Sequence, residues 1–471
     1  MRKFDTRVQY IKYKIIREIA KLAWEDSIDE KLINISNIIS PYESPTMRST
    51  IDKERNIIKE QSKLITDKNK KNKDIIEVID IACERCPSNG YTVTENCRSC
   101  VARCCGSVCP RGAFLFDKNR KAIIDKEKCV ECGRCADSCP FNAIINHKRP
   151  CEKACKVGAI TRKENGSAEI DNQKCISCGA CVYRCPWGAI VDKSYILDII
   201  YAIKNSNENS KYKVYAIVAP SISSQFGYAR LGQVICGIKK LGFYKIIEAA
   251  LGADIVALKE SKELVEKGFL MSSCCPAFVD YVKKQFPNLV KHISTNPSPA
   301  VTTAMCIKKV DLTACIVFIG PCTAKKMEFQ KTGVIDICIT FEELQALFDS
   351  KNIDLAKLED EVLNDASYYG RVFARSGGLT ESVIQGIKEN EINNFELKPI
   401  ACNGIEECKK ALFKLSKNVL DANFIEGMAC AGGCIGGAGC LTHRDRDKKL
   451  VDDHSKKAQK KNIKDAAKKI L

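Results

Sequence analysis

The first part of the chain alternates charged and aliphatic residues in the rhythm of an amphipathic helix, beginning with MRKFDTRVQYIKYKIIREIAKLAW. This rhythm gives way to the polar run TDKNKKNKD. Such a pattern predicts helices followed by a linker. We therefore expect residues 1–75 to form an amino-terminal helical segment.

Beyond residue 195 the pattern changes to apolar runs that alternate with amphipathic stretches. The runs VYAIVAP, ACIVFIGPC and FIEGMAC are typical of buried strands. The stretch ITFEELQAL predicts a helix, because Thr340 and Glu343 form a capping-box pattern at its start. Alternating strands and helices predict an α/β domain over residues 196–445. We expect the basic tail that follows, residues 446–471, to be a solvated helix or disordered.

Three apolar runs of this domain end in cysteine, namely FLMSSCC, IVFIGPC and FIEGMAC. Ligands of open α/β sheets bind beyond the carboxyl ends of the strands. We therefore expect these distant cysteines to meet at one site. The first run ends in two adjacent thiols, Cys274 and Cys275, although a single thiol is enough for a metal bond.

The region between these two parts carries 17 cysteines, from Cys83 to Cys185, and its apolar stretches are too short for an ordinary core. The chain has 29 cysteines among 471 residues, and it is too long and too charged for a disulfide-stapled secreted domain. Free thiols in C-x-x-C spacings favour metal clusters in a reducing compartment. We expect clusters to hold residues 76–195 together, and a cytoplasmic location.

The formal net charge of +17 could indicate nucleic acid binding. However, a 4Fe-4S centre with four thiolates carries roughly −2, so five centres would remove about 10 charges. The lysine-rich runs are then solvated helix faces, or they attract an acidic redox partner. No apolar run approaches the roughly 18 residues of a membrane span, and the amino terminus lacks an export signal. We expect neither nucleic acid binding nor a membrane span.

Two blocks of the cysteine-rich region follow the bacterial ferredoxin run C-x2-C-x2-C-x3-C-P, whereas zinc sites prefer two separated C-x-x-C pairs. A third block, CRSCVARCCGSVCP, has a slightly longer spacing with Cys104 as a bystander. Two half-motifs supply four more ligands. The sixteen ligands, enough for four accessory 4Fe-4S clusters, are Cys83, Cys86, Cys97, Cys100, Cys105, Cys109, Cys129, Cys132, Cys135, Cys139, Cys151, Cys155, Cys175, Cys178, Cys181 and Cys185.

In two-cluster ferredoxins the last cysteine of each run binds the other cluster. The expected groups are Cys97, Cys100, Cys105 and Cys139; Cys109, Cys129, Cys132 and Cys135; Cys155, Cys175, Cys178 and Cys181; and Cys83, Cys86, Cys151 and Cys185. The segment resembles the four-cluster ferredoxin-like subunits of electron-transfer oxidoreductases. That resemblance implies an α+β ferredoxin-like domain over residues 76–195.

Three separate segments of the α/β domain contain cysteines and follow one another along the chain: SCCPAF at 273–278, GPCTAKKMEF at 320–329 and EGMACAGGCIGGAGC at 426–440. They resemble the signature motifs of the FeFe hydrogenases. VAPSISSQFG, LGADIVALKESKEL, ISTNPSP and ARSGGLTES also resemble segments of this family. The resemblance implies a two-lobed α/β domain that binds the H-cluster, a 4Fe-4S cubane bridged by cysteine to a di-iron unit with CO and CN ligands.

By this resemblance the cubane ligands are Cys275, Cys322, Cys430 and Cys434, and Cys434 also bridges to the di-iron unit. Gly432 and Gly433 between the last two ligands would let the backbone approach a bulky cofactor. Lys325 would donate to an anionic cyanide as a point charge. Ser221 is a candidate for a second cyanide contact.

Cys274 then remains as a spare thiol, and it is either a buried hydrophobic side chain or a proton carrier. The resemblance implies that Cys274 serves the di-iron unit with protons. It also implies a relay to solvent through Glu260, Ser294 and Glu263, with Glu328 nearby.

Some residues depart from the prototypical members and resemble the subgroup called group B. Gly320 stands in place of a methionine, Ala277 and Phe278 in place of glycine and tryptophan, and GGAGC in place of GGGQP. Because the methionine is missing, we expect a roomier or wetter space beside the di-iron unit. Seven cysteines match no ligand pattern and are expected to be core thiols: Cys236, Cys306, Cys315, Cys338, Cys402, Cys408 and Cys440.

The sequence thus predicts an enzyme that reversibly oxidises dihydrogen to protons and electrons. A ferredoxin or similar small redox protein would be its partner, and dedicated maturation enzymes would supply the di-iron unit. Two alternatives are a hydrogen sensor of the same family and a non-catalytic iron-sulfur carrier or assembly protein. The latter would need neither Cys274 nor Lys325.

Overall fold

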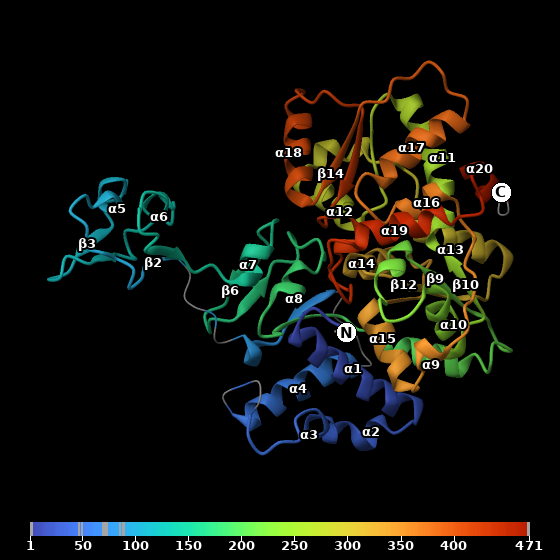
Figure 1. The fold of residues 1–471 in the computed structure, drawn as a ribbon, viewed down its shortest axis with the longest axis horizontal. Coiled ribbons are helices and arrows are strands. Elements are labelled where there is room, and N and C mark those ends of the chain that lie inside the picture. The colour runs from blue at the N-terminus through green and yellow to red at the C-terminus, as the bar shows by residue number, and fades with distance from the viewer. Residues whose placement is uncertain are drawn as a thin grey trace.

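A computed structural model of the chain describes residues 3–45, 48, 50–67, 74–83, 86 and 90–468. The carboxy-terminal domain contains two parallel sheets (Figure 1). One sheet has the strand order β10-β9-β12-β13, with the bounds Lys245–Glu248, Val214–Val218, Cys315–Ile319 and Ile337–Ile339. The other has the order β11-β15-β14, with the bounds Leu270–Met271, Phe424–Met428 and Pro399–Asn403. The three predicted strands are β9, β12 and β15, so the α/β prediction is confirmed.

Helices cover these sheets, and strands β9 and β15 are therefore buried over their whole length. The helices are α9 (Ile196–Asn205), α10 (Leu231–Leu241), α11 (Ala249–Lys267), α12 (Pro276–Gln285), α13 (Pro299–Val310), α14 (Thr323–Thr332), α15 (Phe341–Ser350), α16 (Tyr368–Val372), α17 (Gly378–Glu389) and α18 (Ile405–Ser416). Helix α15 begins with the predicted capping box. Thr340 accepts the backbone N–H of Glu343, and Glu343 accepts that of Thr340.

The amino-terminal segment is helical, as its rhythm predicted. It contains α1 (Arg7–Trp24), α2 (Ile28–Lys31), α3 (Ile35–Ile39) and α4 (Ile51–Thr66), drawn in blue in Figure 1. Helix α1 packs against α15 and α9. Ile16 and Ile19 of α1 belong to the same hydrophobic core as β9 and β12. The segment is therefore packed into the α/β domain, while the predicted linker lies mostly at residues 68–73, outside the described residues.

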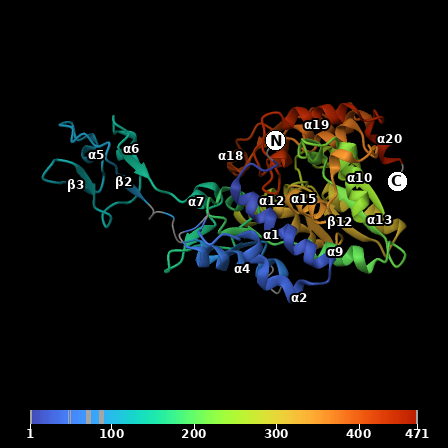
Figure 2. The ribbon, with the colours of Figure 1, turned by 60° about the horizontal axis from the view of Figure 1, so that its bottom comes forward.

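The cysteine-rich region forms two small lobes of two-stranded antiparallel sheets and short helices. The proximal lobe contains β1 (Ile76–Val78), α7 (Pro150–Ala154), β6 (Ile160–Arg162), β7 (Ala168–Ile170), α8 (Ala180–Arg184) and β8 (Ile190–Asp192). The distal lobe contains β2 (Tyr91–Val93), α5 (Cys104–Ser107), β3 (Phe114–Phe116), β4 (Ala122–Ile124), α6 (Arg134–Asp137) and β5 (Ile144–Asn146). The distal lobe projects away from the rest of the chain (Figures 1 and 2). Its core cluster holds only three buried residues, Ile124, Cys135 and Ile144, in agreement with a lobe that needs inorganic clusters.

The described part of the carboxy-terminal tail is helical, as one of the two expectations had it, but its helices pack against the domain and are not merely solvated. Helix α19 (Asp447–Lys456) packs against α16, and α20 (Ile463–Ala467) packs against α11. Val451 and Ile463 are fully buried. The tail has few apolar residues, but helical spacing turns Val451, Ile463 and Ala466 toward the domain, and local composition does not reveal this.

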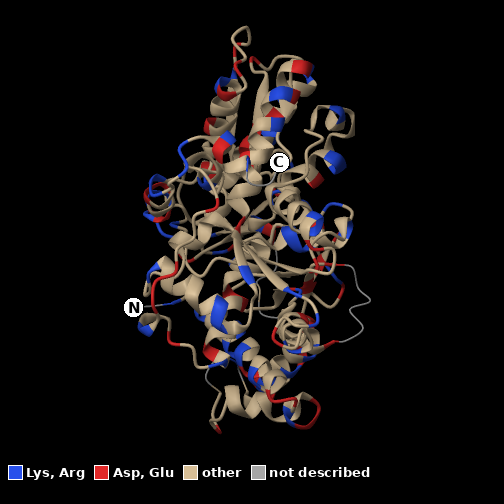
Figure 3. Cartoon of the chain, turned by 90° about the vertical axis from the view of Figure 1, so that its right-hand side faces the viewer, with Lys and Arg blue, Asp and Glu red and all other residues tan. Residues whose placement is uncertain are grey.

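Most charged residues outside this core lie near the surface, and Figure 3 shows basic and acidic residues interspersed on the side of the molecule that it presents. This distribution agrees with lysine-rich runs that are solvated helix faces. Within the described part of the chain, no helix is long and apolar enough to cross a membrane.

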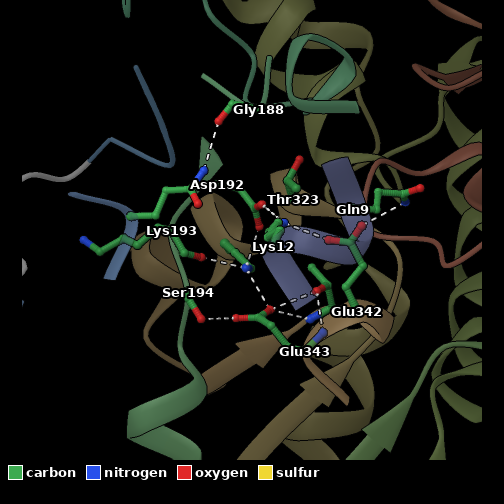
Figure 4. A network of polar contacts seen from close by, with 12 residues as sticks. Gln9, Lys12, Gly188, Asp192, Lys193, Ser194, Thr323, Glu342 and Glu343 are labelled. Atoms are coloured by element: carbon green, nitrogen blue, oxygen red, sulfur yellow. Dashed lines mark hydrogen bonds and ion pairs between the residues drawn. The ribbon is translucent and has the colours of Figure 1, made fainter. Parts of the chain in front are cut away.

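A buried ion network joins three parts of the chain (Figure 4). Lys326 of α14 lies 2.8 Å from Asp192 of β8 and 3.0 Å from Glu343 of α15. Lys12 of α1 lies 2.5 Å from the same aspartate and 2.7 Å from Glu342. Burial works against the charge of Lys326, but the two carboxylates outweigh it and raise its pKa. The network therefore ties α14 to the amino-terminal helix and to the last strand of the proximal lobe.

Replacing Lys326 by Met should strongly destabilise the fold, because it leaves Asp192 and Glu343 buried beside too little positive charge. Breaking a buried pair in this way typically costs ~3–5 kcal/mol. The urea-unfolding midpoint measures the loss. Lys63→Met is the matched control, since its side chain is 68% exposed and its described partner, Glu60, is exposed as well. Equal midpoints for the two variants would contradict a structural role for the network.

Candidate catalytic and cluster-binding site

The four cysteines of the signature motifs meet beyond the carboxyl ends of three strands. Cys275 follows β11 and precedes α12, and Cys322 follows β12 and precedes α14. The remaining two follow β15, the last of them at the start of the 3-10 helix Cys434–Gly436. Burial, together with the charge of the neighbouring Cys275, raises the pKa of Cys322 to about 11. Burial, together with the charges of Cys322 and Cys275, raises the pKa of Cys434 to about 12 and that of Cys430 well above its ordinary value. The thiols are thus close enough to act on one another.

The donor set fits a cluster better than a single ion. Among the described residues, no group of three or more His, Cys, Asp or Glu side chains is placed to share one metal ion. A cubane keeps its four cysteines apart with an iron-sulfide core, whereas zinc draws its ligands into one tight tetrahedron. Iron would also replace the protons that burial holds on these thiols, because coordinated thiols are deprotonated.

A cavity of about 80 Å³ lies beside these thiols. Its lining includes Cys274, Cys275, Cys322, Lys325 and Cys434. At its edge, the fully buried Ser221 follows the lining residue Pro220, and its Oγ has no hydrogen-bond partner within the described residues. An orphaned hydroxyl beside a cavity fits a missing polar ligand, because buried polar groups are normally hydrogen-bonded.

Lys325 points into the same region from the first turn of α14. Its Nζ donates to Ser298 Oγ at 2.8 Å and to the carbonyl oxygen of Cys274 at 3.4 Å. It also pairs with Glu328 at 2.6 Å, and only 10% of its side chain is exposed. Glu328 is therefore the counter-ion of the lysine rather than a link between the cavity and solvent.

The predicted relay residues lie near one another, although Oε2 of Glu260 has no hydrogen-bond partner among the described residues. Ser273 donates to Glu260 of α11 from both its backbone N–H and its Oγ, each at 3.4 Å. Ser294 Oγ donates to Glu263 Oε2 at 2.8 Å. Glu263 pairs at 2.6 Å with Lys267, whose side chain is 38% exposed.

Glu260 is fully buried, and Cys274 is half-buried. Burial raises the pKa of Glu260 to about 7, against hydrogen bonds from Ser273 and Ser294. Burial also raises the pKa of Cys274 well above its ordinary value, and the charge of Glu260 raises it further. The structure thus brings together all four relay residues that the resemblance named, from the cavity to the surface.

The cysteine-rich lobes repeat one hydrogen bond four times, in which the backbone N–H of an alanine donates to the sulfur of the cysteine four residues earlier. The distances are 3.2–3.4 Å, for Cys109, Cys139, Cys155 and Cys185. These cysteines end the predicted ligand runs. A sulfur that accepts N–H groups suits a thiolate bound to iron, and such bonds tune cluster potentials.

The predicted ligand groups can be compared with the electrostatic neighbours of each thiol. Cys105 lies near Cys100 and Cys139, and Cys135 near Cys129 and Cys132. In the proximal lobe, Cys175, Cys178 and Cys181 lie near Cys155, while Cys86 and Cys151 lie near Cys83 and Cys185. These neighbours agree with the crossed-over groups. The placement of Cys97 and Cys109 stays a prediction.

The proximal lobe touches the α/β domain close to both sets of thiols. Cys178 of the lobe and Cys430 of the domain act on each other electrostatically. Thr323 Oγ1 donates to the carbonyl oxygen of Ser177 at 2.7 Å. A Cβ atom on Gly179, whose φ is +74°, would lie 2.6 Å from Ala438 Cβ and from Thr323 Oγ1. The missing side chain therefore allows the two parts to approach.

The space expected at Gly320 is absent, and that part of the prediction was wrong. A Cβ atom added there would lie 2.5 Å from the ring of Phe318, which itself lines the cavity. The aromatic ring fills the volume that the methionine would take. In the sequence, Phe318 is marked only as a strand residue, because nothing in the local pattern shows which way its ring points.

Glu426 is a site residue that the sequence analysis did not single out. It is fully buried in β15 and accepts the backbone N–H groups of Gly377 at 2.7 Å and Thr380 at 2.9 Å. It thereby holds the start of α17. The loop before α17 contains Arg375, which forms an isolated β-bridge with Gly433. A carboxylate within the apolar run FIEGM was the available signal.

Comparisons with known proteins agree with this geometry. Residues 212–438 match the family model of the iron only hydrogenase large subunit, C-terminal domain, and residues 121–186 match a 4Fe-4S dicluster domain. Iron hydrogenase 1 of Clostridium pasteurianum is 29% identical over 397 residues, 72% of this chain and 68% of that protein. The periplasmic Fe hydrogenase large subunit of Nitratidesulfovibrio vulgaris is 28% identical over 383 residues, 69% of this chain and 87% of that protein.

A third relative has a different role by its name. Cytosolic iron-sulfur assembly component 3 of Bos taurus is 24% identical over 267 residues, 44% of this chain and 56% of that protein. The matches together define an iron-sulfur protein with a hydrogenase-type domain. The chain is an FeFe-hydrogenase-like protein.

Replacing Gly179 by Ala should loosen the junction between the proximal lobe and the α/β domain. The new methyl group overlaps Ala438 and Thr323, and overpacking of this kind typically costs ~1–3 kcal/mol. The urea-unfolding midpoint measures the effect. Gly166→Ala is the matched control, because its φ of +83° is similar but nothing lies within 4 Å of its added Cβ. If both variants unfolded alike, backbone strain alone would explain the loss.

Glu260 should make the stability of the protein depend on pH. Its pKa is about 7 in the fold and near 4.5 as an ordinary glutamate, so the folded state keeps a proton that the unfolded state releases. The free energy of unfolding should therefore fall as the pH rises from about 4.5 to about 7. Glu260→Gln should show a flatter dependence over this range in urea titrations. Parallel curves for the two proteins would show that Glu260 is ionised in the fold.

Proposed function

We propose that the chain is an FeFe hydrogenase, which catalyses the reversible oxidation of dihydrogen to two protons and two electrons. One observation carries the proposal: a small cavity is lined by three of the four converging thiols, a buried lysine and a spare thiol that begins a row of proton-carrying groups. When bound, the H-cluster would supply the hydrogen-splitting and electron-accepting chemistry. The four signature cysteines would hold its cubane, with Cys434 as the bridge to the di-iron unit.

The lining residues have separate tasks in this proposal. Lys325 offers a cation to an anionic ligand, and its long contact to the Cys274 carbonyl is the one such a ligand would replace. Ser221 offers its unused hydroxyl as a second donor. Both contacts would position the di-iron unit, because hydrogen bonds to charged groups are worth ~1.5–3 kcal/mol.

Cys274 moves the protons. Its raised pKa keeps a proton on Sγ at the cavity wall, and Glu260 can exchange a proton near neutral pH. Ser294 and Glu263 continue the row to Lys267 at the surface. General acid-base groups work best when their pKa lies near the working pH, which Glu260 satisfies.

Electrons leave on a different side. Cys430 of the cubane group faces Cys178, a ligand of the nearest predicted accessory cluster. The remaining accessory clusters lead through the proximal lobe to the projecting distal lobe, where Cys132 is exposed. A ferredoxin or similar small redox protein would exchange electrons there, in a reducing compartment such as the cytoplasm. Dedicated maturation enzymes would install the di-iron unit, and the departures at residues 277, 278 and 320 favour a chain of group B.

Two alternatives compete with this proposal. A non-catalytic assembly protein would keep the cubane but have no use for a proton row, and the bovine relative is an assembly component by its name. A hydrogen sensor would bind hydrogen without sustained turnover. Hydrogen-dependent reduction of a viologen dye by protein co-expressed with maturation enzymes tests the proposal. Sustained turnover supports an enzyme, and none in fully loaded protein contradicts it.

Replacing Cys274 by Ala should leave the iron content unchanged but lower the rate of hydrogen oxidation about 10² to 10⁴-fold, as for a positioned acid-base group. Cys274→Asp should retain more activity, because a carboxyl group can still carry protons. Cys275→Ala, in the next position, should instead lose cubane iron. A Cys274→Ala enzyme with normal turnover would contradict the proton role, and loss of its cubane would show that the two neighbours are reversed.

A further inference from the structure

The proximal lobe contains a buried arginine that the proposed reaction does not use. Arg149 precedes Pro150, the first residue of α7, and only 2% of it is exposed. Its Nη2 donates to the carbonyl oxygen of Gly166. Within the described residues, its Nε and Nη1 have no hydrogen-bond partner.

A guanidinium buried with unused donors is costly, because buried charges normally need a partner of opposite charge. A carboxylate oxygen of Glu152 lies 3.9 Å from Nε, within the range of an ion pair but too far for a hydrogen bond. Unused donors on a buried cation therefore indicate a missing anionic acceptor.

The arginine lies beside one of the predicted cluster sites. Cys151 follows the arginine by two residues, and Cys83, Cys151 and Cys185 belong to one buried cluster of the proximal lobe. Cys86 lies close enough to the arginine and to Cys83 and Cys185 to interact with their charges. These four thiols form the last of the predicted ligand groups.

We infer that the Arg149 guanidinium donates N–H groups to the sulfur atoms of the cluster held by Cys83, Cys86, Cys151 and Cys185, and thereby raises its reduction potential. The oxidised centre with its four thiolates carries roughly −2, and one added electron makes it roughly −3. A fixed positive charge and N–H donors stabilise the more negative form, so the cluster accepts an electron more readily.

This inference rests on the cluster ligation contained in the proposed function, but it does not depend on hydrogen turnover. It gives this cluster of the proximal lobe a definite task. A cluster that keeps its electron readily would hold one electron inside the chain while the next is being released.

The test is a redox titration of the full-length protein with dithionite, followed by electron paramagnetic resonance. Protein made without the maturation enzymes is suitable, because only the cubanes are observed. The signal of this cluster is the one that Cys86→Ser removes. If no signal disappears in that variant, the cluster assignment fails and the inference with it, while the viologen assay tests the hydrogenase proposal separately.

In Arg149→Gln the reduced-to-oxidised ratio of this cluster at a fixed potential should fall about tenfold, which is a shift of ~59 mV for one electron. The other clusters should keep their potentials. Arg149→Lys should fall between the two proteins, because lysine keeps the charge but loses the planar fork of donors. Arg162→Gln is the matched control, since it removes an exposed positive charge from the same lobe.

A potential in Arg149→Gln equal to that in Arg162→Gln would overturn the inference. Loss of the cluster from both Arg149 variants would also overturn it, in favour of a purely structural arginine. If only Arg149→Gln loses the cluster, the reduction potential of the cluster in Arg149→Lys is compared with that in the unsubstituted protein. A lower potential supports the inference, and an unchanged potential overturns it.

Discussion

Lys326 is fully buried between Asp192 of the proximal lobe and Glu343 of the α/β domain, and Lys12 joins the amino-terminal helix to the same network. A charge at this depth has to be paired, and its two carboxylate partners come from β8 and α15. Its neighbour Lys325 reaches the cavity, and Cys322 begins the same helix. The ion network therefore sets where α14 sits, and α14 carries two of the groups on which the proposed site depends.

This constraint explains why the amino-terminal segment is part of the domain core. Lys12 completes the network through Asp192, which lies 180 positions later in the chain. In the proposed function, electrons and protons would take separate routes. Cys178 and Cys430 lie where the proximal lobe meets the α/β domain, whereas Cys274 and Glu260 would lead past α11 to another surface.

Local sequence patterns predicted those features that depend on local physics. Thr340 and Glu343 predicted the start of α15, and strand-length apolar runs predicted β9, β12 and β15. The cysteines that end FLMSSCC, IVFIGPC and FIEGMAC predicted a shared site, and the repeated C-x-x-C spacing predicted the cluster-binding lobes. Contacts between distant residues were not visible in this way. Phe318 fills the space at Gly320, Glu426 holds the loop before α17, and Val451 and Ile463 bury a tail whose composition looks solvated.

The central claim is that the cavity beside the four signature thiols holds a di-iron unit with carbon monoxide and cyanide ligands. Infrared spectroscopy tests it most directly, because ordinary iron-sulfur clusters carry no such ligands. The account predicts carbonyl and cyanide stretching bands in protein co-expressed with the maturation enzymes, and none in protein made without them. Matured protein with full cubane iron but without these bands would contradict the account and favour an iron-sulfur carrier.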